Sequence, residues 1–489
     1  MTTDLLILVY LAIFVLILTL CAEMLSRRAV LPQWLSRKIL HVGAVGACAV
    51  APVLIENLIL LTWIIFLVEP LLLYLVASRR LFSESNGRRS WGIALFPLAY
   101  LVLLIIFRDQ REFIIIPMAI LAGSDAAAAI IGQLYAKKYY TLTGDRKSFI
   151  GSITFAGSVP LIYILISSIF PTFFIKTDLP NVIFWLGLMG IALILATLEA
   201  LGSNGFDNIW VPLGAALLLQ QLSIQVNNAI IIALWVGILL AILFCLYTIR
   251  KKALTLDGAI MASLLGLWVL WFAGAQWLLP LFFFFITSTF IGRWSKNRTQ
   301  VTDVKHGKAR DYVQVLCNGG IYGVLATFVK IGDQNIILTL MLISMAVCTA
   351  DTWSSEIGIY FRWKTYDIVK MRPVPPGLSG GVSVPGTLGG FFGALAMGIL
   401  GSFLLHNNVK TALILFITAA GFAGMLLDSI MGASVQARYK NLETNEMSDN
   451  KDANMILQNG WRWMTNDAVN VWSNVLIVVI MSLLLYIFF

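Results

Sequence analysis

Charged residues are scarce in this sequence. Asp, Glu, Lys and Arg together make up 12% of its 489 residues, whereas 59% of the residues are hydrophobic and the mean hydropathy is +0.87. A soluble domain of this size needs a much more polar surface, so the composition excludes a soluble globular enzyme. Apolar runs of about 17–25 residues recur along the whole length, and each is long enough to cross a hydrocarbon core of roughly 30 Å as a helix.

Three common signatures are also missing. The five cysteines are scattered through apolar runs without a C-x-x-C pair, which is typical of small buried side chains. The three histidines lack the spacing of zinc ligands. The first apolar run is not followed by an A-x-A-type cleavage site, so we expect a retained helix rather than a cleaved signal peptide.

The apolar runs predict an all-α polytopic membrane protein with about 15–16 transmembrane helices in two weakly repeated parallel halves. The short run at 209–223 is the weakest of the candidates. The predicted helices cover 4–24, 39–55, 57–77, 90–107, 112–135, 149–170, 181–199, 209–223, 227–249, 255–275, 277–292, 312–331, 335–358, 386–405, 410–433 and 468–488.

Basic residues gather on one side of these predicted helices. If the N-terminus faces out, only five of the 34 Lys and Arg lie in outside loops: Arg108, Arg111, Lys176, Lys330 and Lys410. This asymmetry predicts an N-terminus outside, sites that face the cytoplasm, and a bacterial inner membrane as the location. The net charge of +9 follows mainly from the same asymmetry and does not indicate nucleic-acid binding.

The chain divides near 224/225 into halves that share one order of motifs. AGSDAAAAIIG at 122–132 aligns with CTADTWSSEIG at 348–358, which pairs Asp125 with Asp351 at a separation of 226 residues. Both aspartates lie on predicted helices that run from outside to inside, so the repeats are parallel. A carboxylate within an apolar run is costly to bury and is functional by default, so these two acids are the first candidate site residues.

After each acid motif comes a charged loop and then a segment rich in glycine and hydroxyl side chains that opens a new helix. These segments are KSFIGSITFAGS at 147–158 and PGLSGGVSVPGTLGG at 376–390. The backbone N–H groups at such a helix start converge where the helix dipole adds partial positive charge, so the pattern predicts a phosphate cradle. Each half then repeats a helix-ending carboxylate and an acid–amide pair: Glu199 with Asp207–Asn208, and Asp428 with Asn466–Asp467.

A basic motif completes the pattern in each half: SRKILHVG at 36–43 and HGKARDYVQVLCNGG at 306–320. Carboxylates with substrate phosphate oxygens suit Mg²⁺, and lysine and arginine neutralise the charge of a transferring phosphoryl group. Together these features predict Mg²⁺-dependent nucleotide chemistry on an acceptor that arrives from the bilayer. A plainer interpretation stays open, in which the glycines allow close helix packing and Arg37 and Lys38 only set topology. We expect the acids of 441–452 to be solvated loop residues.

The motifs match two known families. In the first half, SRKILHVGAV, AGSDAAAAIIG with KSFIGSITF, and GFDNIWVPLGAAL resemble the phytol and dolichol kinase family over roughly 25–220. In the second half, LDGAIMASLLG, ARDYVQVLCNGG, ADTWSSEIG, GLSGGVSVPGTLGG, LDSIMGASVQ and NDAVNVWSN resemble the phytyl-phosphate kinase family, which includes transmembrane protein 19, over roughly 250–480. Both halves are distantly similar to phosphatidate cytidylyltransferases.

The resemblance implies two membrane domains, a phytol/dolichol kinase-like one at 1–224 and a phytyl-phosphate kinase-like one at 225–489. It implies that CTP and Mg²⁺ serve the phosphorylation of a long-chain isoprenoid alcohol of the phytol or geranylgeraniol type to its monophosphate. A second transfer, from CTP or another nucleotide, then gives the diphosphate. The alcohol and its monophosphate would come from the bilayer and the nucleotide from the cytoplasm.

The resemblance also implies a role for each candidate residue. The catalytic residues would be Asp125, Asp351, His41 and Glu356. The nucleotide and phosphate would be bound by Arg37, Lys38, Lys147, Ser148, Gly151, Ser152, Lys308, Arg310, Asn318, Gly380, Gly381, Ser383 and Gly386. The metal would be held by Asp125, Glu199, Asp207, Asn208, Asp351, Asp428, Asp467 and Asn470.

Three alternatives remain compatible with these motifs. One half can be degenerate, which leaves a single kinase. A cytidylyltransferase that makes a CDP-lipid needs most of the same site. A secondary transporter or lipid flippase built from two repeats also uses intramembrane acids and glycine-broken helices.

Overall fold

The computed structural model describes residues 2–28, 30–78, 91–224, 227–298, 309–405, 410–441, 447–449 and 455–488. The described residues form sixteen α-helices and eight short strands, so the predicted all-α class is confirmed. The chain separates into two compact units, unit 1 at Met1–Val236 and unit 2 at Gly237–Phe489. The sequence predicted this division near 224/225, whereas the boundary lies between Val236 and Gly237, within the next helix of the chain.

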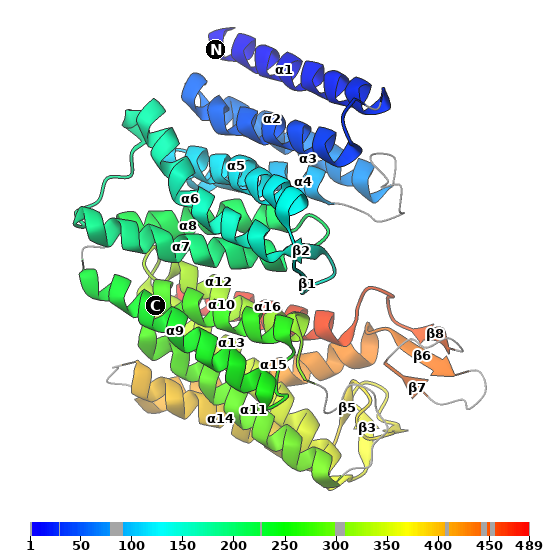
Figure 1. Ribbon diagram of the computed structural model, residues 1–489. Helices are drawn as coiled ribbons and strands as arrows, with labels where there is room; N and C mark the ends of the chain where they lie inside the picture. The colour runs from blue at the N-terminus through cyan, green and yellow to red at the C-terminus, as the bar shows by residue number, and fades with distance from the viewer. Residues whose placement is uncertain are drawn as a thin grey trace. The chain divides into compact units, whose positions relative to one another are not determined.

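Unit 1 consists of helices around a buried α5, with one β-hairpin (Figure 1). Its elements are α1 (Thr2–Arg27), α2 (Gln33–Leu54), α3 (Leu58–Ala77), α4 (Gly92–Ile106), α5 (Glu112–Tyr135), β1 (Tyr139–Thr141), β2 (Arg146–Ser148), α6 (Phe149–Ile169), α7 (Asn181–Leu201) and α8 (Asp207–Ser223). Helix α9 (Asn228–Arg250) begins in unit 1 and continues into unit 2.

Unit 2 consists of helices around a buried α13, with two small sheets (Figure 1). Its further helices are α10 (Leu256–Phe272), α11 (Leu278–Arg298), α12 (Tyr312–Phe328), α13 (Gln334–Phe361), α14 (Val384–Leu404), α15 (Lys410–Ser434) and α16 (Asn466–Phe488). The strands are β3 (Thr365–Asp367), β4 (Pro373–Val374) and β5 (Gly381–Val382) in one sheet, and β6 (Arg438–Asn441), β7 (Met447–Ser448) and β8 (Met455–Asn459) in the other.

The predicted helices match the observed ones closely. The largest differences are at α2, which starts six residues before position 39, and at α11, which ends six residues after position 292. Both added turns are polar, QWLSRK and RWSKNR, so they carry no hydropathy signal. Among the described residues, twelve helices are long and apolar enough to cross a membrane, whereas α4, α8, α10 and α12 have only 15–17 residues.

A four-helix core recurs in both units. In unit 1, α5 packs on α6 and α8, and α7 packs on α6 and α8; in unit 2, α13, α14, α15 and α16 repeat the same four contacts. In both units a short antiparallel sheet follows the first core helix and leads into the second. The third and fourth core helices are joined directly by residues 202–206 in unit 1 but through β6, β7 and β8 in unit 2.

Hydrogen bonds bring several connecting loops of unit 1 together at one end of its core. Thr143 donates its hydroxyl to the carbonyl of Leu201, and the backbone N–H of Asn204 donates to Asp145. The backbone N–H of Trp91 donates to the carbonyl of Asn204. The loops before α4, α6 and α8 therefore meet, and the side chains at the starts of these helices can share one site.

Candidate active sites

Asp125 lies on α5 and faces two basic side chains of α2. The Nζ atom of Lys38 is 2.7 Å from Asp125 Oδ2, and Nε2 of His41 is 3.4 Å from the same oxygen. Lys38 and His41 are three residues apart, so they share one face of α2. Asp125, which has no nearby basic residue in the sequence, is therefore neutralised by Lys38, 87 residues earlier in the chain.

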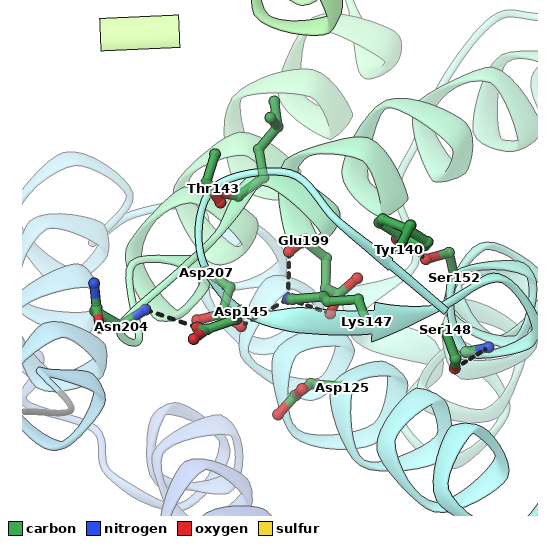
Figure 2. A network of polar contacts seen from close by, with 12 residues as sticks. Asp125, Tyr140, Thr143, Asp145, Lys147, Ser148, Ser152, Glu199, Asn204 and Asp207 are labelled. Carbon is green, nitrogen blue, oxygen red and sulfur yellow. Dashed lines mark hydrogen bonds and ion pairs between the residues drawn. The ribbon is translucent and has the colours of Figure 1, made fainter. Parts of the chain in front are cut away.

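Lys147 joins two further carboxylates in unit 1. Its Nζ atom lies 2.6 Å from Glu199 Oε1 and 3.4 Å from Asp207 Oδ2, and Figure 2 shows the side chain reaching between them. Burial opposes the charge of Lys147, but the two carboxylates outweigh it and raise the pKa of the ammonium group above its usual range. The two carboxylates therefore favour the charged form of Lys147, the central residue of β2.

The three acids of unit 1 form one cluster. Asp125, Glu199 and Asp207 each offer a carboxylate oxygen, and these oxygens all lie within 4.8 Å of one another. They come from α5, the end of α7 and the start of α8, which the core packing brings together. The sequence predicted this association, and the structure places Lys38, His41 and Lys147 around it.

The glycine-rich start of α6 makes close structural contacts. Ser148 caps the helix by accepting a hydrogen bond from the Gly151 backbone N–H at 3.1 Å. A Cβ atom at Gly151 would lie 3.0 Å from the carbonyl oxygen of Ala128 on α5, so only glycine permits this approach. Ser152 pairs with the hydroxyl of Tyr140 at 2.5 Å. Close packing accounts for the glycine here, and phosphate binding by this segment stays a prediction.

Two further residues of unit 1 were predicted to belong to the site. The Asn208 side-chain amide donates to the carbonyl oxygen of Gly92 at 3.1 Å and is buried against α4. Arg37 is exposed on α2 beside the more buried Lys38. The metal role of Asn208 and the phosphate role of Arg37 also stay predictions.

Unit 2 contains a cavity of about 540 Å³ lined by the ends of α11, α12, α13, α15 and α16 and by the loop before α14. The predicted residues of the second half line it together: Arg310, Asn318, Asp351, Glu356, Gly380, Gly381, Ser383, Gly386, Asp428, Asp467 and Asn470. Lys308 lies outside the described residues. The basic residues Lys251, Lys252 and Arg293 also line the cavity, and the sequence assigned no site role to Lys251 or Lys252.

Asp428, one of the acids that line this cavity, has neutral hydrogen-bond donors. Asp428 Oδ2 accepts a hydrogen bond from the Ser473 hydroxyl at 3.1 Å. The Asn470 amide, oriented to satisfy its hydrogen bonds, donates to the same oxygen at 3.1 Å. Within the described residues, neither Asp428 nor Asp351 forms an ion pair. These carboxylates therefore differ from those of unit 1, which meet ammonium groups.

Arg310 stands on another wall of the cavity. Burial lowers the pKa of its guanidinium, and the nearby Glu356 carboxylate partly offsets that effect. Its guanidinium carbon lies 5.7 Å from the centre of the Phe284 ring. A half-buried guanidinium that lines a polar cavity is suited to bind a phosphate group.

The glycine-rich loop before α14 repeats the packing of unit 1. Gly380 has φ of 76°, and a Cβ atom there would lie 2.4 Å from the backbone nitrogen of Ala433, so no other residue fits. Ser383 caps α14 by accepting from the Gly386 N–H at 3.3 Å, as Ser148 does on α6. A Cβ atom at Gly386 would lie 2.9 Å from the carbonyl oxygen of Ser354 on α13.

A buried ion pair fixes this loop and was missed by the sequence. Arg438 Nη1 lies 3.1 Å from Asp367 Oδ2, and Arg438 Nη2 donates to the carbonyl oxygen of Ser379. Backbone N–H groups of Lys370 and Val369 and the Arg438 guanidinium outweigh burial and lower the pKa of Asp367 below its usual range. The sheets β3–β5 and β6–β8 are therefore joined through one arginine.

Asp449 corrects one expectation. The acids of 441–452 were expected to be solvated, but Asp449 Oδ2 accepts from the Ser379 backbone N–H at 3.0 Å and the residue lines the cavity. Glu443, Glu446 and Asp452 lie outside the described residues. The Ser379 hydroxyl in turn donates to Asn466 Oδ1 at 3.1 Å. No local pattern identifies such a role, because the partners are 70 and 87 residues apart.

Comparisons with known proteins relate the chain to a family of membrane proteins. A family model described as "Integral membrane protein DUF92" matches residues 239–478. An uncharacterized membrane protein of Methanocaldococcus jannaschii is 32% identical over 203 residues, which are 42% of this chain and 83% of that protein. Protein PGR of Arabidopsis thaliana is 32% identical over 228 residues, 41% of this chain and 78% of that protein.

A third relative has an activity in its name. The phytol kinase of Synechocystis sp. is 30% identical over 217 residues, which are 41% of this chain and 84% of that protein. No solved structure matches the chain.

Proposed function

The chain belongs to the integral membrane protein family DUF92, and from this membership and the two polar sites we propose that it is a membrane-embedded kinase of long-chain isoprenoid alcohols. Unit 1 would convert the alcohol to its monophosphate, and unit 2 would convert the monophosphate to the diphosphate. CTP is the proposed donor of the first transfer. The observation that carries the proposal is the recurrence of one four-helix core with an acidic site at the same position in both units.

The site of unit 1 suits a neutral acceptor. The alcohol oxygen attacks the terminal phosphorus of the nucleotide, the bond from this phosphorus to the bridging oxygen breaks, and the nucleoside diphosphate leaves. The hydroxyl proton must be removed, and Asp125 Oδ1 is suited to accept it because both basic contacts reach Oδ2. His41 Nε2 is buried 3.4 Å from the same Oδ2 but forms no aligned hydrogen bond among the described residues, so it is free to donate to or accept from a polar ligand.

Lys38 and Lys147 give the same site its positive charge. Charge spreads over the oxygens of the phosphoryl group during transfer, and fixed cations stabilise it. Lys147 is held by two carboxylates, so its ammonium group is already placed before substrate binds. Preorganised charge of this kind is effective because it needs no rearrangement during the reaction.

The site of unit 2 suits an anionic acceptor. An oxygen of the monophosphate attacks the terminal phosphorus of the second nucleotide, so no proton has to be removed from a hydroxyl group. Two anions must instead be brought together, and Lys251, Lys252, Arg293 and Arg310 line the cavity. The cavity volume of about 540 Å³ is of the size that small-molecule sites have.

The cavity also supports access from the aqueous side. Asp351 lies ten residues before the end of α13, which is roughly 15 Å along the helix axis. The same cavity is lined by loop residues such as Gly380 and Lys251 and by Asp351. With the N-terminus outside, as proposed from the basic loops, the nucleotide would enter from the cytoplasm while the isoprenoid chain stays in lipid.

Product analysis with purified protein tests this function. With radiolabelled CTP and phytol we expect a lipid monophosphate first, then a diphosphate, with release of CDP. Control reactions lack the alcohol. Formation of a CDP-lipid with release of pyrophosphate would identify a cytidylyltransferase instead. Nucleotide-independent uptake by proteoliposomes, without any phosphorylated product, would identify a transporter.

A further inference from the structure

The two sites differ in how the negative charge of their carboxylates is neutralised. In unit 1, Lys38 lies 2.7 Å from Asp125, and Lys147 lies 2.6 Å from Glu199 and 3.4 Å from Asp207. Every acid of that cluster therefore meets an ammonium group. Although the three carboxylates are close enough together to hold a metal ion, Lys147 already lies between two of them.

Unit 2 has no such compensation in the described part of the chain. Asp428 accepts hydrogen bonds from Ser473 and Asn470, which are neutral donors. Asp351 has neither an ion pair nor a hydrogen bond to its carboxylate there. Arg310, which lines the same cavity, interacts with Glu356. Two neighbouring carboxylates without a cation are costly where they are partly removed from water.

A second observation points to a ligand in this cavity. The hydroxyl of Ser288 on α11 lines the cavity, the residue is 1% exposed, and the oxygen has no hydrogen-bond partner among the described residues. Asp449 lines the cavity as well, and its Oδ1 atom is likewise buried and unpartnered. A hydrated ion bound to Asp351 and Asp428 offers water molecules to such groups, since Mg²⁺ retains several waters in proteins.

We propose that unit 2 binds one divalent cation through Asp351 and Asp428, whereas in unit 1 the ammonium groups of Lys147 and Lys38 take the place of a metal. The chain then holds one tight cation site rather than two. The inference rests on the proposed function in that it assigns the cation to the transfer with the anionic acceptor. There the cation offsets the repulsion between two phosphate groups, which the neutral alcohol of unit 1 does not cause.

Binding of Mn²⁺ to the full-length protein without nucleotide tests the proposal. Electron paramagnetic resonance measures free Mn²⁺ during a titration, and we expect one tight site per chain. Asp428→Asn removes an uncompensated charge, so this variant should fold and lose the site. Glu199→Gln is the matched variant of unit 1 and should keep it. Because no turnover is needed, the result is independent of whether the protein is a kinase.

A variant that gains a Mn²⁺ site provides a second and more specific test. Lys147→Met leaves Glu199 and Asp207 without their cation, so the number of tight Mn²⁺ sites should rise from one to two. Lys147→Arg retains the charge and should still show one. Two tight sites or none in the unaltered protein would overturn the proposal, as would loss of the site in Glu199→Gln or no second site in folded Lys147→Met. Size-exclusion profiles establish which variants are folded.

Discussion

At the scale of single residues, two glycines at the starts of core helices can be tested by simple substitutions. Gly151 on α6 and Gly386 on α14 each lie against a carbonyl oxygen of the preceding core helix. Ser148 and Ser383 cap these helices in the same way. The repeated serine–glycine pair therefore sets the distance between the first two core helices in both units. That spacing places Asp125 and Asp351 relative to the loops.

Gly151→Ala is expected to destabilise the protein. The added methyl group would lie 2.7 Å from Ser148 Oγ and 3.0 Å from the Ala128 carbonyl oxygen, so the helices must separate. Forced overpacking of this kind costs typically about 1–3 kcal/mol. Thermal unfolding of purified protein in detergent measures the change.

Gly157→Ala on the same helix is the control. Apart from the backbone of its own helix, no described heavy atom lies within 4 Å of a Cβ atom at Gly157, so the substitution should be neutral or stabilise the helix by up to about 1 kcal/mol. Equal melting temperatures for the two variants would show that the contact between α5 and α6 does not set stability here.

At the scale of elements, Arg438 connects two small sheets to the glycine-rich loop. Its guanidinium binds Asp367 on β3 and the carbonyl oxygen of Ser379, and Asp367 and Arg438 are both almost fully buried. The β6–β8 sheet lies between the third and fourth core helices, where unit 1 has only residues 202–206. This addition holds the loop of unit 2 over its cavity.

Arg438→Met should selectively impair the second transfer. The substitution leaves Asp367 buried without its cation, which costs typically about 3–5 kcal/mol, and frees the loop. We expect a raised KM for the nucleotide in the reaction of unit 2 and unchanged formation of monophosphate by unit 1. Steady-state kinetics with alcohol and with monophosphate as separate substrates measures both.

The double variant Arg438→Met/Asp367→Asn should recover part of the loss, because it removes the orphaned charge. The pH dependence has a defined sign. The pKa of Asp367 is lowered, so the ion pair stabilises the protein above the ordinary pKa of an aspartate and its contribution disappears as pH falls through the lower, folded value. The penalty of Arg438→Met should therefore shrink in acid. A penalty that stays constant with pH, or no recovery in the double variant, would contradict this role.

At the scale of the whole molecule, the sequence predicted the helices well because span length and hydropathy are local properties. It also predicted which acids gather in each half, since the motifs repeat in the same order. The sequence did not predict the long-range contacts between polar loops. The pairing of Arg438 with Asp367 is an example, because no periodicity in the sequence reveals it. The compensation of Asp125 by Lys38 likewise depends on how α2 packs on α5.

The repeated core suggests how one chain can carry two consecutive reactions. Each unit has its own buried helix, its own acids and its own set of basic groups. The additions differ: unit 1 supplies lysines to its acids, and unit 2 adds a sheet and has a polar cavity of about 540 Å³. Duplication followed by such divergence would suit a neutral first acceptor and an anionic second one.

The central claim is that each unit performs one transfer, and single-site variants test it most directly. Purified Asp125→Asn and Asp351→Asn proteins are each given phytol or phytyl monophosphate with labelled CTP, and Asp109→Asn, an exposed acid away from both sites, is the control. Asp125→Asn should lose monophosphate formation by a factor of about 10² or more and still make diphosphate from monophosphate. Asp351→Asn should make monophosphate and stop there. Equal loss of both reactions in both folded variants would contradict the claim.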